Sequence, residues 1–90
     1  MNEIQLFGEL GPDQVDSLSE KLGWLLEQPR PQLELDLCNV TSLHLGIVNV
    51  LIGARNEAQA RLGDLRVVVG SGSETQYTLA RVGIVATLRP

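Results

Sequence analysis

Residues 33–50 constrain the fold of this 90-residue chain more than any other stretch. Leu33, Leu35 and Leu37 alternate with acidic residues, which is typical of a strand that buries one face. A loop and an unusually apolar helix follow directly. Strand-to-helix junctions of this kind carry the working site in many open α/β folds. Because no convergent set of reactive side chains stands at this junction, we interpret it as a surface that binds another protein.

Apolar spacing on both sides of this stretch predicts alternating strands and helices. Pro12 suits the first turn of an amphipathic helix that Pro29 ends, and Ser73 and Gln76 have capping-box spacing for a later helix. Trp24 lies off the apolar stripe and is either a partly exposed packing residue or a contact point. The expected strands cover residues 3–6, 33–37, 65–69 and 84–88, the expected helices cover residues 12–25, 45–62 and 73–82, and residues 39–43 form a loop. We therefore predict one α/β domain over residues 1–90, with a mostly parallel or mixed, roughly four-stranded sheet and three to four helices packed against it.

The helix expected at residues 45–62 has two faces of different character. Its core face is apolar and consists of Ile47, Leu51, Ala54, Ala58 and Leu62, widened by Val48 and Ile52. Its opposite face is small or neutral and consists of Gly46, Asn49, Gly53, Asn56 and Ala60. Exposed helix faces usually carry charged pairs, and a glycine inside a helix costs up to about 1 kcal/mol relative to alanine. This face therefore predicts close approach by another surface.

The composition argues against several classes of function. A net charge of −4 and 3% aromatic residues disfavour nucleic acid and acidic partners, which need basic side chains. The single cysteine, Cys38, forms no internal disulfide and is expected to be a small buried hydrophobe. No apolar stretch approaches the roughly 20 residues of a spanning helix, and no secretory leader precedes the first strand. We therefore expect a cytoplasmic protein without direct membrane insertion.

The residues give little support for chemistry. His44 is the only histidine, whereas a metal site needs three or four ligands, so we expect no metal and no cofactor. Ser42, His44 and Asp36 alternate in one strand and loop and do not converge as a catalytic triad would. Residues 70–73 could hold a phosphate on backbone amides, but they lack the lysine of a nucleotide-binding loop and are interpreted as a turn and helix cap. We predict that the protein is not an enzyme.

Three short motifs follow one another along almost the whole chain. They are Leu6-Phe7-Gly8-Glu9-Leu10, then Leu35-Asp36-Leu37 followed by Val40 and Thr41, then Leu79-Ala80-Arg81-Val82-Gly83-Ile84. In this order they resemble the L-x-G-E-L, D-L-x-x-V and L-x-x-x-G-[LI] motifs of the STAS domain family, which includes bacterial anti-sigma factor antagonists and domains of sulfate transporters and lipid-transport complexes. The family often has an extra leading strand that this chain lacks, so a homodimer mate could cover the exposed sheet edge.

The family's phosphorylation signature, D-S-[ST]-G, follows its central strand. Alignment on Val40 without gaps places His44 at the aspartate, Leu45 at the phosphoserine and Gly46 at the next small residue. The phosphoacceptor is therefore absent, since leucine has no hydroxyl, and Ser42 lies three residues earlier in the expected loop. In phosphorylatable members the added negative charge alters docking. The resemblance implies a module that stays competent to bind or is regulated through its partner.

We therefore predict a non-enzymatic, anti-sigma factor antagonist-like regulator of transcription that binds a serine-kinase-type anti-sigma factor. The residues expected to contact the partner are Thr41, Ser42, Leu43, His44, Leu45, Gly46, Asn49 and Gly53. Of these, the polar side chains would supply hydrogen bonds, the leucines apolar contact, and the glycines close backbone approach. The alternative is a STAS subunit of an ABC-type lipid transport complex that supports its ATPase. A small hydrolase that depends on His44 is a third, weaker alternative.

Overall fold

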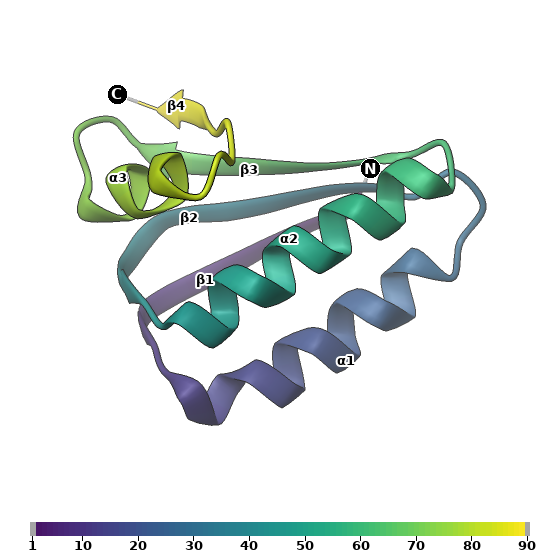
Figure 1. Ribbon diagram of the computed structural model, residues 1–90, viewed down its shortest axis with the longest axis horizontal. Helices are drawn as coiled ribbons and strands as arrows, with labels where there is room; N and C mark the ends of the chain where they lie inside the picture. Colours follow the sequence, from purple (N-terminus) through teal and green to yellow (C-terminus); the bar gives the residue numbers. More distant parts are fainter. Residues whose placement is uncertain (1, 90) are drawn as a thin grey trace.

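Strands and helices alternate along the chain in the computed structural model, which describes residues 2–89 (Figure 1). The strands are β1 (Asn2–Leu10), β2 (Gln32–Leu43), β3 (Asp64–Gly70) and β4 (Thr87–Arg89). The helices are α1 (Val15–Leu26), which follows the short 3-10 helix η1 (Pro12–Gln14), then α2 (Leu45–Ala60) and α3 (Glu74–Arg81). This alternation confirms the α/β fold class that the sequence predicts.

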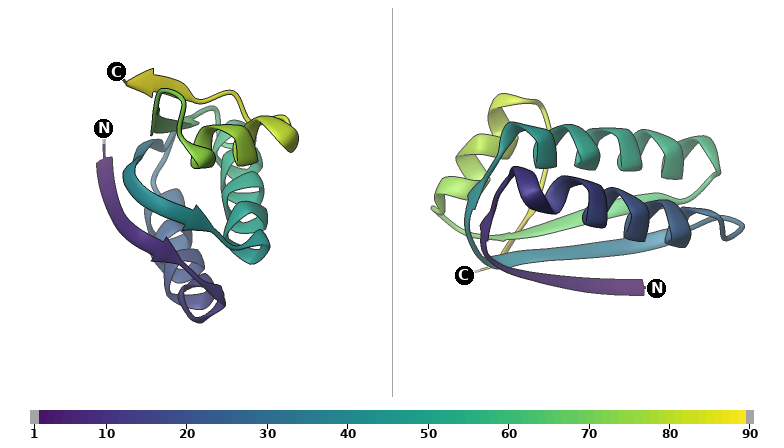
Figure 2. Two further views of the ribbon diagram at one scale, coloured as in Figure 1. Left: turned by 90° about the vertical axis from the view of Figure 1, so that its left-hand side faces the viewer. Right: turned by 90° about the horizontal axis from the view of Figure 1, so that it is seen from below.

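The four strands lie in the order β1-β2-β3-β4, and each neighbouring pair described between residues 2 and 89 is parallel. The sheet is therefore parallel throughout, which agrees with the first of the two arrangements, mostly parallel or mixed, that the sequence predicted. Each pair of consecutive strands is joined through a helix, which returns the chain to the end of the sheet where the previous strand began. Crossovers between parallel strands are right-handed. Because the strands follow one another across the sheet in chain order, right-handed crossovers place all three connecting helices on the same face of the sheet. Figure 2 shows α1, α2 and α3 on one side of the sheet, and no helix or strand of residues 2–89 on the other.

The core lies between the sheet and the three helices. Its fully buried members come from the inward faces of β2 and β3 and from the apolar stripe of each helix, and include Leu22, Leu33, Leu35, Leu37, Ile47, Leu51, Val69 and Leu79. The predicted stripe of α2 is buried except for Leu62, which is 76% exposed. The helix ends at Ala60, and the Gly63 amide donates back to the Ala58 carbonyl at 2.8 Å, so Leu62 belongs to the turn toward β3.

Strands β1 and β2 are longer than the sequence predicted. Gly8 was expected to end β1, but it adopts a φ of +72° within the strand, a conformation that glycine accepts without strain. Two register shifts let β1 follow β2 beyond this point, and the last pair is Leu10 with Leu43. Residues 39–43, predicted as a loop, therefore form the end of β2.

The sheet face without helices is held by polar contacts that cross the strands. Asp36 is buried there, and its carboxylate accepts hydrogen bonds from the Cys38 amide at 3.0 Å and from Arg89 Nη1 at 3.1 Å. The Arg89 contact joins β4 to β2 across β3. The strand residue between them, paired with Asp36, is the buried Val68. Hydrogen bonds from Cys38, with a further contribution from Arg89, lower the pKa of Asp36. Cys38 itself is half-buried, whereas the sequence predicted a buried residue. Burial, with a further contribution from Asp36, raises the pKa of its thiol and so favours the protonated form.

Replacing this carboxylate should make stability depend on pH in a defined direction. Because the folded pKa of Asp36 is lowered, its contribution is present above the unfolded pKa of about 3.9 and is lost as pH falls through the folded pKa. Asp36→Asn should lower the free energy of unfolding by about 1–2 kcal/mol at pH 7, and this deficit should shrink below about pH 4. Urea unfolding across this range measures both quantities.

Glu34→Gln is the matched control, because the Glu34 carboxylate lies 3.7 Å from a half-exposed Arg66. Solvent screens such a pair, so the loss should be below about 0.5 kcal/mol. A deficit for Asp36→Asn that stays constant down to about pH 2.5 contradicts the assigned role of the carboxylate.

Candidate protein-binding surface

The predicted site residues lie where β2 meets α2, but they do not form the loop that the sequence predicted. Thr41, Ser42 and Leu43 are the last residues of β2, and Leu45 is the first residue of α2. Only His44 lies between the two elements. Thr41 is exposed, whereas Ser42 and Leu43 are half-buried, and Leu43 packs against the core. Pairing with β1 fixes this geometry, because Ser42 lies opposite Glu9 and Leu43 opposite Leu10.

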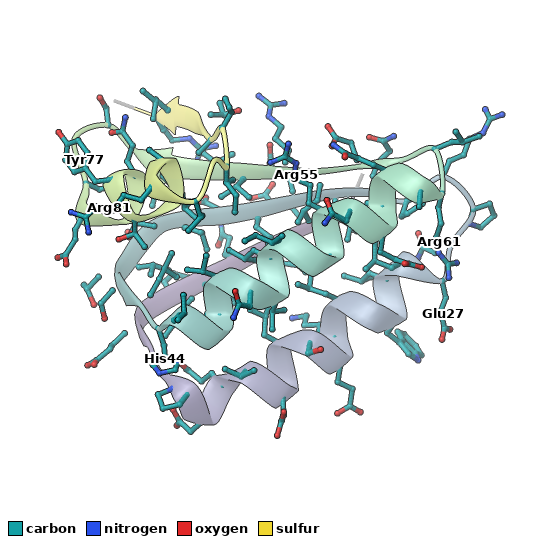
Figure 3. The ribbon with its side chains drawn as sticks, in the orientation of Figure 1. Glu27, His44, Arg55, Arg61, Tyr77 and Arg81 are labelled. Carbon is teal, nitrogen blue, oxygen red and sulfur yellow. The ribbon has the colours of Figure 1, made fainter. Side chains whose placement is uncertain are left out.

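His44 caps the amino-terminal end of α2, as Figure 3 shows. Its Nδ1 accepts a hydrogen bond from the Gly46 amide at 3.0 Å, and its own amide donates to the Leu10 carbonyl at 2.9 Å. An imidazole that accepts through Nδ1 carries its proton on Nε2, which leaves one N–H free to donate from the surface. Sequence reasoning expected a donor to a partner and missed the cap. The position of His44, directly before an apolar helix, is the signal that could have found it.

One exposed stripe of α2 carries no charge, and the exposed Glu57 of the same helix lies outside this stripe, paired with Arg61 at 2.8 Å. We define the α2 face as Leu45, Asn49, Gly53, Asn56 and Ala60, all of which are exposed. They fall on one side of the helix at steps of three and four residues. Leu45 is 66% exposed at the first turn and is the largest apolar side chain of this face. The exposed leucine at one end and the small and amide side chains beyond it form an uncharged surface on which another protein could pack.

The two glycines expected to allow close approach have different surroundings. A Cβ atom at Gly46 would lie 2.9 Å from Val15 Cγ2, so the start of α1 already occupies the space next to this glycine. At Gly53 no atom lies within 4 Å of such a Cβ. Gly53 instead borders a shallow groove of about 220 Å³ between α1 and α2. The chain's own packing therefore explains Gly46 and leaves Gly53 without an internal reason to be glycine.

The polar side chains near the junction are engaged separately. His44 bonds through Nδ1 to the Gly46 amide, whereas Asp36 bonds to Cys38 and Arg89 on the open side of the sheet. These contacts do not link Ser42, His44 and Asp36 into a triad.

Among residues 2–89 no group of three or more His, Cys, Asp or Glu side chains is placed to hold a metal ion. In the same part of the chain, no helix combines the length and the apolar character that crossing a membrane requires.

Sequence reasoning missed several exposed apolar side chains outside α2. Phe7 is 61% exposed on β1, and Tyr77, Val82 and Val85 are exposed around and after α3. Phe7 has the same parity as Glu3 and Gln5, so strand alternation could have placed it on the open side of the sheet. No comparable pattern marks the residues around α3. These side chains make further surfaces, which are separate in sequence from the α2 face.

Comparison with known proteins places this geometry in a family. The model of the family described as "Mlab, STAS domain" matches residues 2–89, and the chain therefore belongs to the STAS domain family. This confirms the resemblance seen in the motifs. A solved structure of the anti-sigma factor antagonist SpoIIAA in its unphosphorylated form is similar in fold. It has a TM-score of 0.72 and 20% sequence identity, and the match covers 98% of this chain and 77% of SpoIIAA. No curated protein sequence matches the chain.

Removing the His44 side chain should weaken the start of α2. His44→Ala deletes the bond to the Gly46 amide and should lower the free energy of unfolding by about 1 kcal/mol. His44→Asp is the matched variant, because its carboxylate can cap the helix and its charge suits the helix dipole, and it should keep or exceed the stability of the natural chain. Urea unfolding at pH 7 compares the three proteins. Equal losses in both variants would show that the cap contributes nothing.

Proposed function

We propose that this STAS protein is a non-enzymatic, anti-sigma factor antagonist-like module that docks a serine-kinase-type anti-sigma factor through the α2 face and the end of β2. The observation that carries the proposal is the exposure of Leu45, a large apolar side chain held at the junction by a rigid strand and a capped helix. Burying the exposed part of Leu45 in a partner would contribute about 1–2 kcal/mol. Thr41 and the free N–H of His44 would add hydrogen bonds beside it.

The proposal includes binding without a phosphorylation switch at the family's usual position. Leu45 occupies that position in the alignment on Val40 and offers no hydroxyl group. Ser42 is half-buried at the end of β2 and lies opposite Glu9 of β1. A phosphate on Ser42 would therefore lie next to Glu9. Repulsion between that phosphate and Glu9 disfavours modification. Control of the complex would then reside in the partner, through its amount or its own state.

A charge placed at Leu45 should separate docking from folding. Leu45→Glu adds a negative charge to the first turn of α2, where the helix dipole favours it, so the free energy of unfolding should stay within about 0.5 kcal/mol of the natural value. The same carboxylate would have to be desolvated in the interface, so partner affinity should fall by at least about 30-fold. Titration calorimetry with a candidate anti-sigma factor from the same organism measures this affinity.

Leu62→Glu is the matched control, because Leu62 is a similarly exposed leucine beyond the opposite end of α2. It should bind the partner as the natural chain does. Equal affinity losses in both variants would contradict the assignment of the surface. The anti-sigma factor could fail to bind while an ABC-type ATPase binds in a Leu45-dependent manner. That result would support the location of the binding surface, and the lipid-transport function would replace the regulatory one.

Incubation with the candidate kinase and ATP tests the missing switch. The intact mass of this chain should not change, because the family position carries a leucine. A SpoIIAA-type substrate treated in the same reaction serves as the positive control. A gain of one phosphate on Ser42 or Thr41, mapped by peptide fragmentation, would contradict the proposed unswitched binding and move the acceptor into the end of β2.

A further inference from the structure

Strand β1 forms one edge of the sheet and offers a second surface. It runs for nine residues and is paired only with β2, as Figure 2 (left) shows at the outer side of the sheet. Among the described residues, no backbone hydrogen bond reaches the free side of β1 from another element. Edge strands of this length are usually shortened, covered or protected by lysine, because their free amides and carbonyls pair readily with another strand. Here β1 carries no lysine or arginine.

The side chains that β1 exposes are acidic and apolar. Glu3, Gln5, Phe7 and Glu9 alternate along the open side and are exposed. The ion pairs found between residues 2 and 89 involve neither Glu3 nor Glu9. On the same side of the sheet, Glu34 and Asp36 are already paired with arginines. Glu3 accepts one exposed hydrogen bond, from Gln5 Nε2 at 3.4 Å. The edge therefore has two acidic side chains without a cationic partner among the described residues, with an exposed phenylalanine between them.

On the helix-covered face of the sheet, α1 forms a second surface next to the free edge of β1. A groove of about 180 Å³ runs between β1 and α1 and is lined by Leu6, Leu10, Ser17 and Lys21 among others. It shares Ser17 and Lys21 with a wider hollow of about 500 Å³ along the flank of α1, which Trp24 and Leu25 line. Trp24 is 76% exposed. A strand added beside β1 would place its inward side chains in this hollow, against the indole ring.

We propose that the free edge of β1 binds an extended segment of a partner protein that alternates basic and apolar side chains. The backbone of the segment pairs with β1 as a fifth strand. Its basic side chains face Glu3 and Glu9, and its apolar side chains pack against Trp24 and Leu25 on the helix side. Charge complementarity selects a basic segment, because opposite charges on neighbouring strands attract and like charges repel.

The same charges disfavour a second copy of this chain as the occupant. Antiparallel pairing of the whole of β1 with its own copy centres on Leu6 and sets Glu3 opposite Glu9 twice. Each of these pairs would bring two carboxylates together. This edge is therefore assigned to a partner of opposite charge instead of to the homodimer that was one way to cover it.

Binding of a short lysine-bearing peptide tests the proposal directly. The probe is the fluorescein-labelled, capped peptide Lys-Val-Lys-Val-Lys-Val-Lys, compared with the same peptide in which glutamate replaces lysine. Anisotropy should show saturable binding of the lysine peptide alone. An unlabelled copy should shift the emission of Trp24, the only tryptophan of the chain, to shorter wavelength as the ring is covered. The double variant Glu3→Lys, Glu9→Lys should bind about tenfold more weakly.

The control is the double variant Glu57→Lys, Glu74→Lys, which makes the same change in net charge on α2 and α3. It should bind the peptide as the natural chain does, and so should Leu45→Glu, which separates this edge from the α2 face. Equal binding of the glutamate peptide, equal weakening in the control, or no saturation by about 1 mM overturns the proposal. A dimer in sedimentation equilibrium with exchange-protected β1 amides would assign the edge to a second copy and also overturn it.

Discussion

The pairing of β2 with β1 over the full length of β1 determines the geometry of the proposed binding surface. Three inward leucines bury β2 between its neighbours and the helices, and the ladder continues to the pair Leu10 and Leu43. The next amide, that of His44, bonds to the Leu10 carbonyl, and α2 begins one residue later. Leu45 is thus exposed at a corner whose backbone is held on one side by the β1-β2 pairing and on the other by the first turn of α2. A surface fixed before binding loses little conformational entropy when it docks.

The unbroken strand order explains which surfaces remain available. Because all helices lie on one side, the other side of the sheet is not covered by a helix. On that side the side chains of Asp36 and Arg89 form a polar contact across β3. The strand order over residues 2–89 also has no reversal, and a reversal is the point at which open α/β folds usually bind small ligands. What remains is a charge-free helix face and an acidic sheet edge. Both are suited to proteins, in agreement with membership of the STAS domain family.

The sequence predicted the fold class and the order of elements because apolar periodicity reports burial directly. It misplaced the end of β2, since residues 39–43 have no clean alternation and are kept extended by long-range pairing with β1, which local spacing does not encode. Similarly, the sequence separated the two faces of α2, but it could not show that Gly46 packs against Val15. The exposure of Leu45 was expected and is observed, whereas the capping role of His44 depends on a geometry that only the fold supplies.

Amide chemical-shift mapping can establish whether a partner binds this STAS protein at the corner between β2 and α2. In a titration of the isotope-labelled chain with the proposed partner, a candidate anti-sigma factor, the largest shifts should fall on Thr41, Leu45, Asn49 and Gly53, with smaller changes on the opposite end of α2. Shifts concentrated on α3 and β4, with the corner unchanged, would contradict the account.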